Sequence, residues 1–172
     1  LNGDPHPGNS LFMSDDRVGF LDFGFFKTLS QDEVDQLMAS TRATYDHDAQ
    51  ALFKVIAPLG QLPDDPALAE PFYDSYWSIF GWLLTDRSVK VDGRATGAMM
   101  RSYSRLRKAE EFRSLMLPAE HFVLMRAVML LIGLLGGLQA EGNWLDVARE
   151  WLLGEEPATE LGRLEAEFFT PR

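Results

Sequence analysis

LNGDPHPGNSLFMSDDRVGFLDFG, residues 1–24, is the stretch that decides the fold of this 172-residue chain. Two prolines and two glycines lie within residues 3–9, so this segment forms neither a helix nor a central strand. Two short apolar runs follow, at residues 11–13 and 18–21, with the turn-forming residues Ser14-Asp15-Asp16 between them. The pattern predicts a loop that leads into a small β-hairpin.

The hairpin is expected to bring together polar groups that suit a hard cation. Asn9 ends the loop, and Asp22 follows the returning strand, 13 residues later. An amide oxygen and a carboxylate suit Mg²⁺, which prefers oxygen ligands. Asp4, five residues before Asn9, would be available to orient or deprotonate a nucleophile. Phosphoryl transfer from ATP uses this combination of a base, an Asn ligand and an Asp-Phe-Gly ligand.

An ordinary loop is the alternative explanation for these residues. Asp, Asn, Pro and Gly are common in loops, and an isolated Asp-Phe-Gly recurs by chance. The joint pattern, D-x-x-x-x-N followed by a hairpin and then Asp-Phe-Gly, is more specific than any of its parts. We therefore interpret residues 1–24 as a phosphoryl-transfer motif.

The remainder of the chain has the spacing of helices. Ser30 and Glu33 form a capping-box pattern, which predicts a helix that reaches about Tyr45. We expect a loop over residues 86–97, and further helices at about 48–59, 66–85 and 98–112, from near Pro118, after Asn143 and over 158–169. The sequence therefore predicts a mainly α fold, with its only strand signal in the short β-hairpin at the front.

The composition excludes several classes of protein. Residues 1–86 carry 4 basic and 14 acidic residues, and residues 87–172 carry 12 of each, so the first half holds the whole net charge of -10. This acidic balance argues against broad nucleic-acid binding, which needs basic surface. The chain has no cysteine, which excludes disulfides, thiolate metal sites and a Cys nucleophile.

Two later segments allow more than one interpretation. Residues 127–140 carry no charge but are shorter than the ~20 residues that cross a bilayer. We expect a buried core helix there, with a membrane-dipping segment as the alternative. Residues 87–113 hold 8 basic and 3 acidic residues. A solvated helix face is the simplest interpretation, and contact with anionic lipid or a partner is the functional one.

Asp4-Pro5-His6-Pro7-Gly8-Asn9, followed by Leu21-Asp22-Phe23-Gly24, resembles the signature of the UbiB/AarF family of atypical kinases. These are protein-kinase-like proteins linked to ubiquinone and other isoprenoid-lipid metabolism. Residues 120–144 are similar, more loosely, to the C-terminal region of that family. The resemblance implies that residues 1–172 form the C-terminal lobe of a protein-kinase-like α+β fold. Residues 1–29 would hold the catalytic loop, hairpin and Asp-Phe-Gly, and residues 30–172 the helical body.

The resemblance also implies roles for individual residues. Asp4 matches the catalytic Asp of the family, and His6 stands where ordinary protein kinases carry a Lys near the transferring phosphate. The implied cofactors are ATP and Mg²⁺, and the implied cofactor-binding residues are Asn9, Asp22, Phe23 and Gly24. Of these, Asn9 and Asp22 match the two Mg²⁺-binding positions.

Two departures from the family pattern bear on activity. Asn2 stands where family members commonly have a His. The Lys-x-Gly-Gln helix, the Ala-rich nucleotide loop and the ATP-binding Lys of the family are not among these 172 residues. We therefore expect a fragment of a longer kinase, without the N-terminal lobe, that is inactive in isolation.

The function implied for the whole protein is ATP-dependent phosphoryl transfer or ATP hydrolysis in support of ubiquinone or isoprenoid-lipid metabolism. The implied partners are a nucleotide, the native N-terminal lobe, and an isoprenoid lipid or a membrane-associated biosynthetic complex, with no nucleic acid. The implied location is the cytoplasm or the surface of the inner membrane, with no transmembrane segment in this chain. One alternative is a non-catalytic nucleotide-binding module, which Asn2 favours. The other is a small-molecule phosphotransferase, which usually carries Asp-x-Asp in place of Asp-Phe-Gly.

Overall fold

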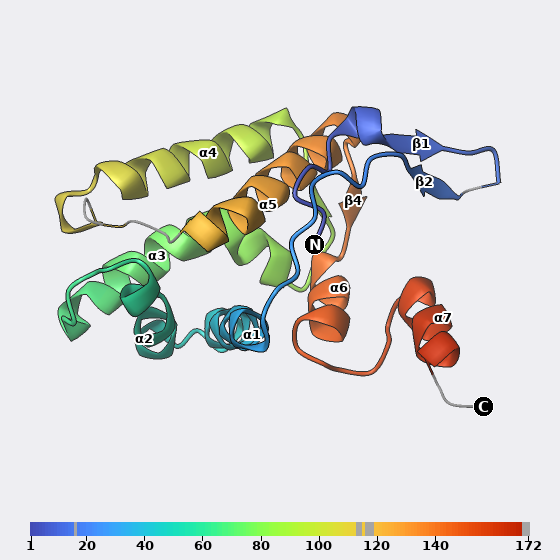
Figure 1. The fold of residues 1–172 in the computed structure, drawn as a ribbon. Coiled ribbons are helices and arrows are strands. Elements are labelled where there is room, and N and C mark those ends of the chain that lie inside the picture. Colours follow the sequence, from blue (N-terminus) through green and yellow to red (C-terminus); the bar gives the residue numbers. More distant parts are fainter. Residues whose placement is uncertain (16, 113–114, 116–118, 170–172) are drawn as a thin grey trace.

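The computed structural model describes residues 1–15, 17–112, 115 and 119–169. This described chain is mostly helical, with two small two-stranded sheets (Figure 1). The helices are α1 (Gln31–Tyr45), α2 (Ala49–Leu59), α3 (Ala69–Phe80), α4 (Gly93–Lys108), α5 (Ala119–Leu138), α6 (Trp144–Trp151) and α7 (Glu160–Phe169). The strands are β1 (Ser10–Phe12), β2 (Val18–Phe20), β3 (Val89–Lys90) and β4 (Glu141–Gly142). The short 3₁₀-helices are η1 (Pro7–Asn9), η2 (Pro66–Leu68), η3 (Gly81–Leu84) and η4 (Glu110–Phe112).

The front hairpin forms as predicted. Strands β1 and β2 pair antiparallel, with Leu11 opposite Gly19. The pairing continues beyond the strands, because the backbone N–H of Leu21 donates to the carbonyl oxygen of Asn9 over 2.9 Å. The hairpin projects from the helical body (Figure 1). The predicted turn residue Asp16 lies outside the described residues.

Helix α1 begins with the predicted capping box. The Ser30 hydroxyl accepts the backbone N–H of Glu33 over 3.3 Å, and the Glu33 carboxylate accepts the backbone N–H of Ser30 over 2.8 Å. Lys27 pairs with the same carboxylate. Hydrogen bonding from Lys27 and from the backbone of Ser30 lowers the pKa of Glu33 from 4.5 to about 2. The cap is therefore charged at neutral pH.

The main core lies where α1 packs on α2, α2 on α3 and α3 on α4. Leu52, Phe72 and Ile79 are completely buried in or beside this cluster. Burial of each such side chain stabilises the fold by about 1.5–3 kcal/mol. Helix α2 is capped by the side chain of Asp48 and ends before Gly60, as the sequence predicted.

The single helix expected over residues 66–85 is wrong, because the segment forms η2, α3 and η3 in succession. The change from α3 to η3 occurs at Gly81, whose missing side chain leaves room for the indole of Trp77. The hydroxyl of Thr85 then donates to the carbonyl oxygen of Gly81 over 2.7 Å. The Thr85 hydroxyl and the tighter 3₁₀ turn thus provide hydrogen bonds for backbone groups at the end of α3.

The loop expected over residues 86–97 is also wrong. Helix α4 begins at Gly93 instead of about Ala98, because Oδ1 of Asp92 accepts the backbone N–H groups of the first turn. Just before it, Val89 in β3 pairs with Gly142 in β4. The front hairpin is therefore one of two strand pairs in the described chain. The second pair joins segments too distant in sequence for a local pattern to predict.

Helix α5 runs beside α4 and toward the N-terminal segment (Figure 1). Ile132 is buried, but Leu131 is 47% exposed, and only 11% of residues His121–Leu138 are buried. The expected buried core helix is therefore wrong for most of its length, because its neighbours cover only part of its surface. By length and composition alone, α5 could cross a membrane. This is weak evidence for a membrane span, because the core helices of other proteins pass the same test. Pro118, predicted in its first turn, lies outside the described residues.

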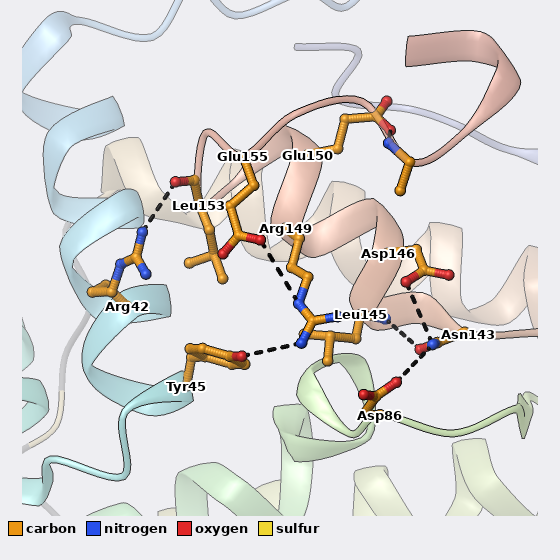
Figure 2. Close-up of polar contacts among 11 residues, drawn as sticks. Arg42, Tyr45, Asp86, Asn143, Leu145, Asp146, Arg149, Glu150, Leu153 and Glu155 are labelled. Carbon is orange, nitrogen blue, oxygen red and sulfur yellow. Dashed lines mark hydrogen bonds and ion pairs between the residues drawn. The ribbon is translucent and has the colours of Figure 1, made fainter. Parts of the chain in front are cut away.

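Polar side chains fasten α6 and the segment after it to α1 (Figure 2). Arg149 donates to the hydroxyl of Tyr45 over 3.3 Å, and Arg42 donates to the carbonyl oxygen of Leu153 over 3.0 Å. Asn143 caps α6, as predicted. The bonds of Arg149 and Arg42 thus join α6 and the segment after it to the helix that directly follows the hairpin region.

Candidate functional site

The loop before the hairpin is closed by its own hydrogen bonds. The backbone N–H of Asp4 donates to Oδ1 of Asn2 over 2.9 Å. The carbonyl oxygen of Asp4 accepts the backbone N–H of His6 over 2.7 Å and the side-chain amide of Asn9 over 3.3 Å. Nδ1 of His6 accepts the backbone N–H of Gly8 over 3.0 Å. These bonds hold Asp4, His6 and Asn9 in one compact loop.

The same bonds determine which side-chain atoms remain for other chemistry. Asn9 donates through Nδ2, so Oδ1 is the atom left to bind a cation. His6 accepts through Nδ1, so its ring proton lies on Nε2. The side chain of His6 is exposed, and Asn9 is half-buried. The loop therefore offers an amide oxygen and an imidazole N–H to a ligand.

Asp22 lies directly after the second strand of the hairpin. Its Oδ1 accepts the backbone N–H of Gly24 over 2.7 Å. The backbone bond from Leu21 to Asn9 places this turn beside the end of the loop. The hairpin thus brings Asp22 next to the loop that holds Asn9, as its length and turn predicted.

Exposed aromatic side chains follow Asp22. Phe23 is 67% exposed, Phe25 44% and Phe26 52%. The rings of Phe23 and Phe26 stack with 5.6 Å between their centroids. Apolar side chains this exposed, and this close together, form a surface suited to contact with another body.

Backbone pairing joins the two ends of the candidate site and seats them on α5. The N–H of Gly3 donates to the carbonyl oxygen of Phe25, and the N–H of Lys27 donates to that of Leu1, each over 2.9 Å. Gly3 is buried, and a β-carbon there would lie 2.8 Å from the Phe25 ring and 2.9 Å from Cγ1 of Val123. Glycine therefore permits this close approach to α5 without any movement of Phe25 or Val123.

Arg126 on α5 joins the site, although the sequence did not assign it a role there. Its Nη2 atom lies 2.9 Å from Oδ1 of Asp4, across 122 residues of sequence. The two side chains are 44% and 35% exposed, respectively. The sequence signal was a single arginine ahead of an uncharged stretch, and that signal carries no information about its partner.

Asn9 and Asp22 each present a side-chain oxygen of the kind that Mg²⁺ prefers in a site shared with phosphate. Among the described residues, no group of three or more His, Cys, Asp or Glu side chains could hold a metal by itself. Mg²⁺ is commonly held by one or two carboxylates together with substrate phosphates, and seldom by protein alone. Within the described chain, hydrogen bonds engage Nδ2 of Asn9 and Oδ1 of Asp22, which leaves one oxygen of each side chain without a partner.

Comparison with known proteins supports a kinase-like family. Residues 1–56 match the model of the ABC1 atypical kinase-like domain. This match covers the loop, the hairpin, α1 and most of α2.

Two curated relatives align with most of the chain. An uncharacterized protein of Synechocystis sp. is 27% identical over 152 residues, which are 88% of this chain and 21% of that protein. An uncharacterized protein from the hydrogenase 1 5′ region of Clostridium pasteurianum is 24% identical over 147 residues, which are 86% of this chain and 26% of that protein. The chain thus spans about a fifth to a quarter of the length of these relatives. No solved structure matches the chain. Of these comparisons, the ABC1 match at residues 1–56 is the one that points to a function, because it coincides with the candidate site.

Proposed function

We propose that this chain carries half of a phosphoryl-transfer site, in an ABC1-type atypical kinase or ATPase that uses Mg-ATP. Asp4 is the base or orienting group, and Asn9 and Asp22 are the magnesium ligands. The arrangement of the loop and hairpin carries the proposal. The backbone bond from Leu21 to Asn9 brings the Asp-Phe-Gly turn next to the loop. The match of residues 1–56 to a kinase-like family supports the same chemistry.

The proposed reaction balances with ATP as phosphoryl donor and a hydroxyl or water as acceptor. The acceptor oxygen forms a bond to the γ-phosphorus, and the bond from that phosphorus to the β–γ bridging oxygen breaks, which releases ADP. The acceptor's proton passes to a carboxylate oxygen of Asp4. Bound Mg²⁺ would neutralise charge on the phosphate oxygens. In the chain itself, Asn9 and Asp22 would hold that ion, and the exposed side chain of His6 would contact a phosphate group.

We assign the other half of the ATP site to an N-terminal lobe in a longer chain. The hairpin supports this assignment, because Leu11, Phe12 and Phe20 are 51%, 59% and 59% exposed. An apolar hairpin of this kind suits burial by another lobe. The chain spans about a fifth to a quarter of its curated relatives, which leaves ample length for one. The 172 residues alone are then inactive.

The finer biological role rests on the resemblance of Asp4-Pro5-His6-Pro7-Gly8-Asn9 to the UbiB/AarF signature. We propose that the whole protein serves ubiquinone or isoprenoid-lipid metabolism, in the cytoplasm or at the surface of the inner membrane. Its partners would be an isoprenoid lipid or a membrane-associated biosynthetic complex.

The test is Mg-ATP turnover by the full-length product of the gene that encodes these residues. Asp22→Asn should reduce turnover by roughly 100-fold or more, because it removes a charge that holds the metal. The amide oxygen can still accept the N–H of Gly24, so the turn keeps its hydrogen bond. The matched control is Asp15→Asn, an exposed acid in the turn of the same hairpin.

Three results distinguish the proposal from its alternatives. Loss of turnover in Asp22→Asn, with Asp15→Asn unchanged, supports the metal assignment. Turnover that is equal in all three proteins refutes it. Tight ATP binding without turnover in the unmodified protein supports instead a non-catalytic nucleotide-binding module, which the Asn at position 2 favours.

A further inference from the structure

The carboxylate of Asp4 is held from a distant part of the chain. Nη2 of Arg126 lies 2.9 Å from Oδ1 of Asp4, and the two residues are 122 positions apart. Within the described residues, no hydrogen bond engages Oδ2 of Asp4. The guanidinium therefore fixes one oxygen and leaves the other available to an acceptor proton.

The helix that carries Arg126 also packs against the backbone just before Asp4. Val123 lies three residues before Arg126, so the two side chains lie on the same face of α5. Cγ1 of Val123 comes within 2.9 Å of the point where a β-carbon of Gly3 would stand. One turn of α5 thus contacts both the loop backbone and the carboxylate that the loop presents.

A purely stabilising role explains this ion pair poorly. The Arg126 side chain is 44% exposed and that of Asp4 is 35% exposed. Ion pairs this accessible to water contribute little to folding, because both charges are already well solvated. A single contact between Nη2 and Oδ1 nevertheless orients a carboxylate, since rotation about the bond to its carboxyl carbon would break it.

We propose that Arg126 is a positioning residue for the phosphoryl-transfer reaction, an inference that rests on the proposed function of Asp4. Arg126 holds Oδ1 so that Oδ2 faces the acceptor. The loop alone holds the Asp4 backbone, through the side chain of Asn2 and the amide of Asn9. The guanidinium adds the control of side-chain rotation that those backbone bonds do not provide.

The kinetic test uses the full-length protein with Mg-ATP and the variants Arg126→Ala, Arg126→Lys and Asp22→Asn. Arg126→Ala should lower kcat by roughly 10- to 100-fold, as expected for a misplaced catalytic group. The KM for ATP should stay within about two-fold, because Arg126 binds the base and not the nucleotide. Arg126→Lys and added guanidinium should each restore part of the lost kcat. Arg101→Gln, an exposed cation on α4, is the matched control and should leave kcat unchanged.

A spectroscopic measurement tests the contact without relying on turnover. In protein labelled with ¹³C at the aspartate carboxyl carbons, the Asp4 signal is identified by its loss in Asp4→Asn. This signal should shift in Arg126→Ala and return when guanidinium is added. A signal that does not move would overturn the inference, whatever the kinetics show.

The kinetic outcomes distinguish the role of Arg126 from the proposed function of the site. If Asp22→Asn abolishes turnover but Arg126→Ala retains it, the role of Arg126 is refuted and the proposed function stands. A raised KM with unchanged kcat refutes positioning and makes Arg126 a nucleotide ligand. A kcat loss that neither lysine nor guanidinium restores shows a structural role only. Turnover that Asp22→Asn leaves intact refutes the proposed function itself, and with it the inference.

Discussion

Replacing Gly3 with alanine tests how tightly the loop is seated on α5. The added β-carbon would lie 2.8 Å from two atoms of the Phe25 ring and 2.9 Å from Cγ1 of Val123. Carbon atoms pack at about 3.5–4.0 Å, so the neighbours must move by roughly 0.6–1.2 Å. Overpacking of this kind costs about 1–3 kcal/mol. Because Phe25 is 44% exposed and can turn outward, we expect the lower part of that range, about 1–2 kcal/mol.

The assay is equilibrium unfolding of the chain in urea, followed by circular dichroism. Gly133→Ala is the matched control, because nothing lies within 4 Å of a β-carbon at that position of α5. Alanine there should stabilise the helix by about 0.5–1 kcal/mol. Val123→Ala removes one of the clashing atoms, so the double variant Gly3→Ala/Val123→Ala should be more stable than additivity predicts, by about 0.5 kcal/mol or more.

Two results would contradict this reasoning. If Gly3→Ala is as stable as the unmodified chain, the loop does not rest on α5 as closely as the structure has it. If the effects of Gly3→Ala and Val123→Ala simply add, Val123 is not the obstacle. Either result would also weaken the case that α5 holds the site, because the contact of Arg126 with Asp4 depends on the same approach.

Two further predictions concern the helical body. Leu52→Ala should lower the free energy of unfolding by about 2–5 kcal/mol, because Leu52 is completely buried. The control is Leu164→Ala, at a side chain that is 57% exposed. In the same urea titration it should change the free energy of unfolding by less than about 0.5 kcal/mol. The pKa of Glu33 is lowered from 4.5 to about 2, so its contribution to stability is present above pH 4.5 and is lost as the pH falls toward 2. Unfolding titrations between pH 5 and pH 2 should therefore give a shallower pH dependence for Glu33→Gln than for the unmodified chain.

Local patterns predicted the parts of the fold that depend on near neighbours. The capping box at Ser30 and Glu33 formed as the sequence indicated, and so did the cap at Asn143. The front hairpin also formed, because its two apolar runs are separated by a short turn. In each case, the residues that determine the structure lie close together in sequence, so spacing alone contains the information.

Contacts between distant segments account for the errors. Val89 pairs with Gly142, so part of the predicted loop is a strand. Neither segment is apolar enough to indicate a strand from its sequence. Residues 127–140 were expected to be buried because they are uncharged, yet Leu131 and Leu138 are exposed. Hydropathy indicates that a segment can be buried, but the number of neighbouring elements decides whether it is.

The candidate site shows the same division between near and distant residues. Asp4 and Asn9 lie five residues apart, and a short hairpin returns Asp22 to the neighbourhood of Asn9, so these two juxtapositions could be predicted. The contact of Arg126 with Asp4 required knowledge of where α5 lies. Gly3 contributes to that placement, because a β-carbon at this position would stand 2.9 Å from Cγ1 of Val123 on α5. The glycine before Asp4 is therefore more than a turn former, because its missing side chain lets the loop approach the helix that carries Arg126.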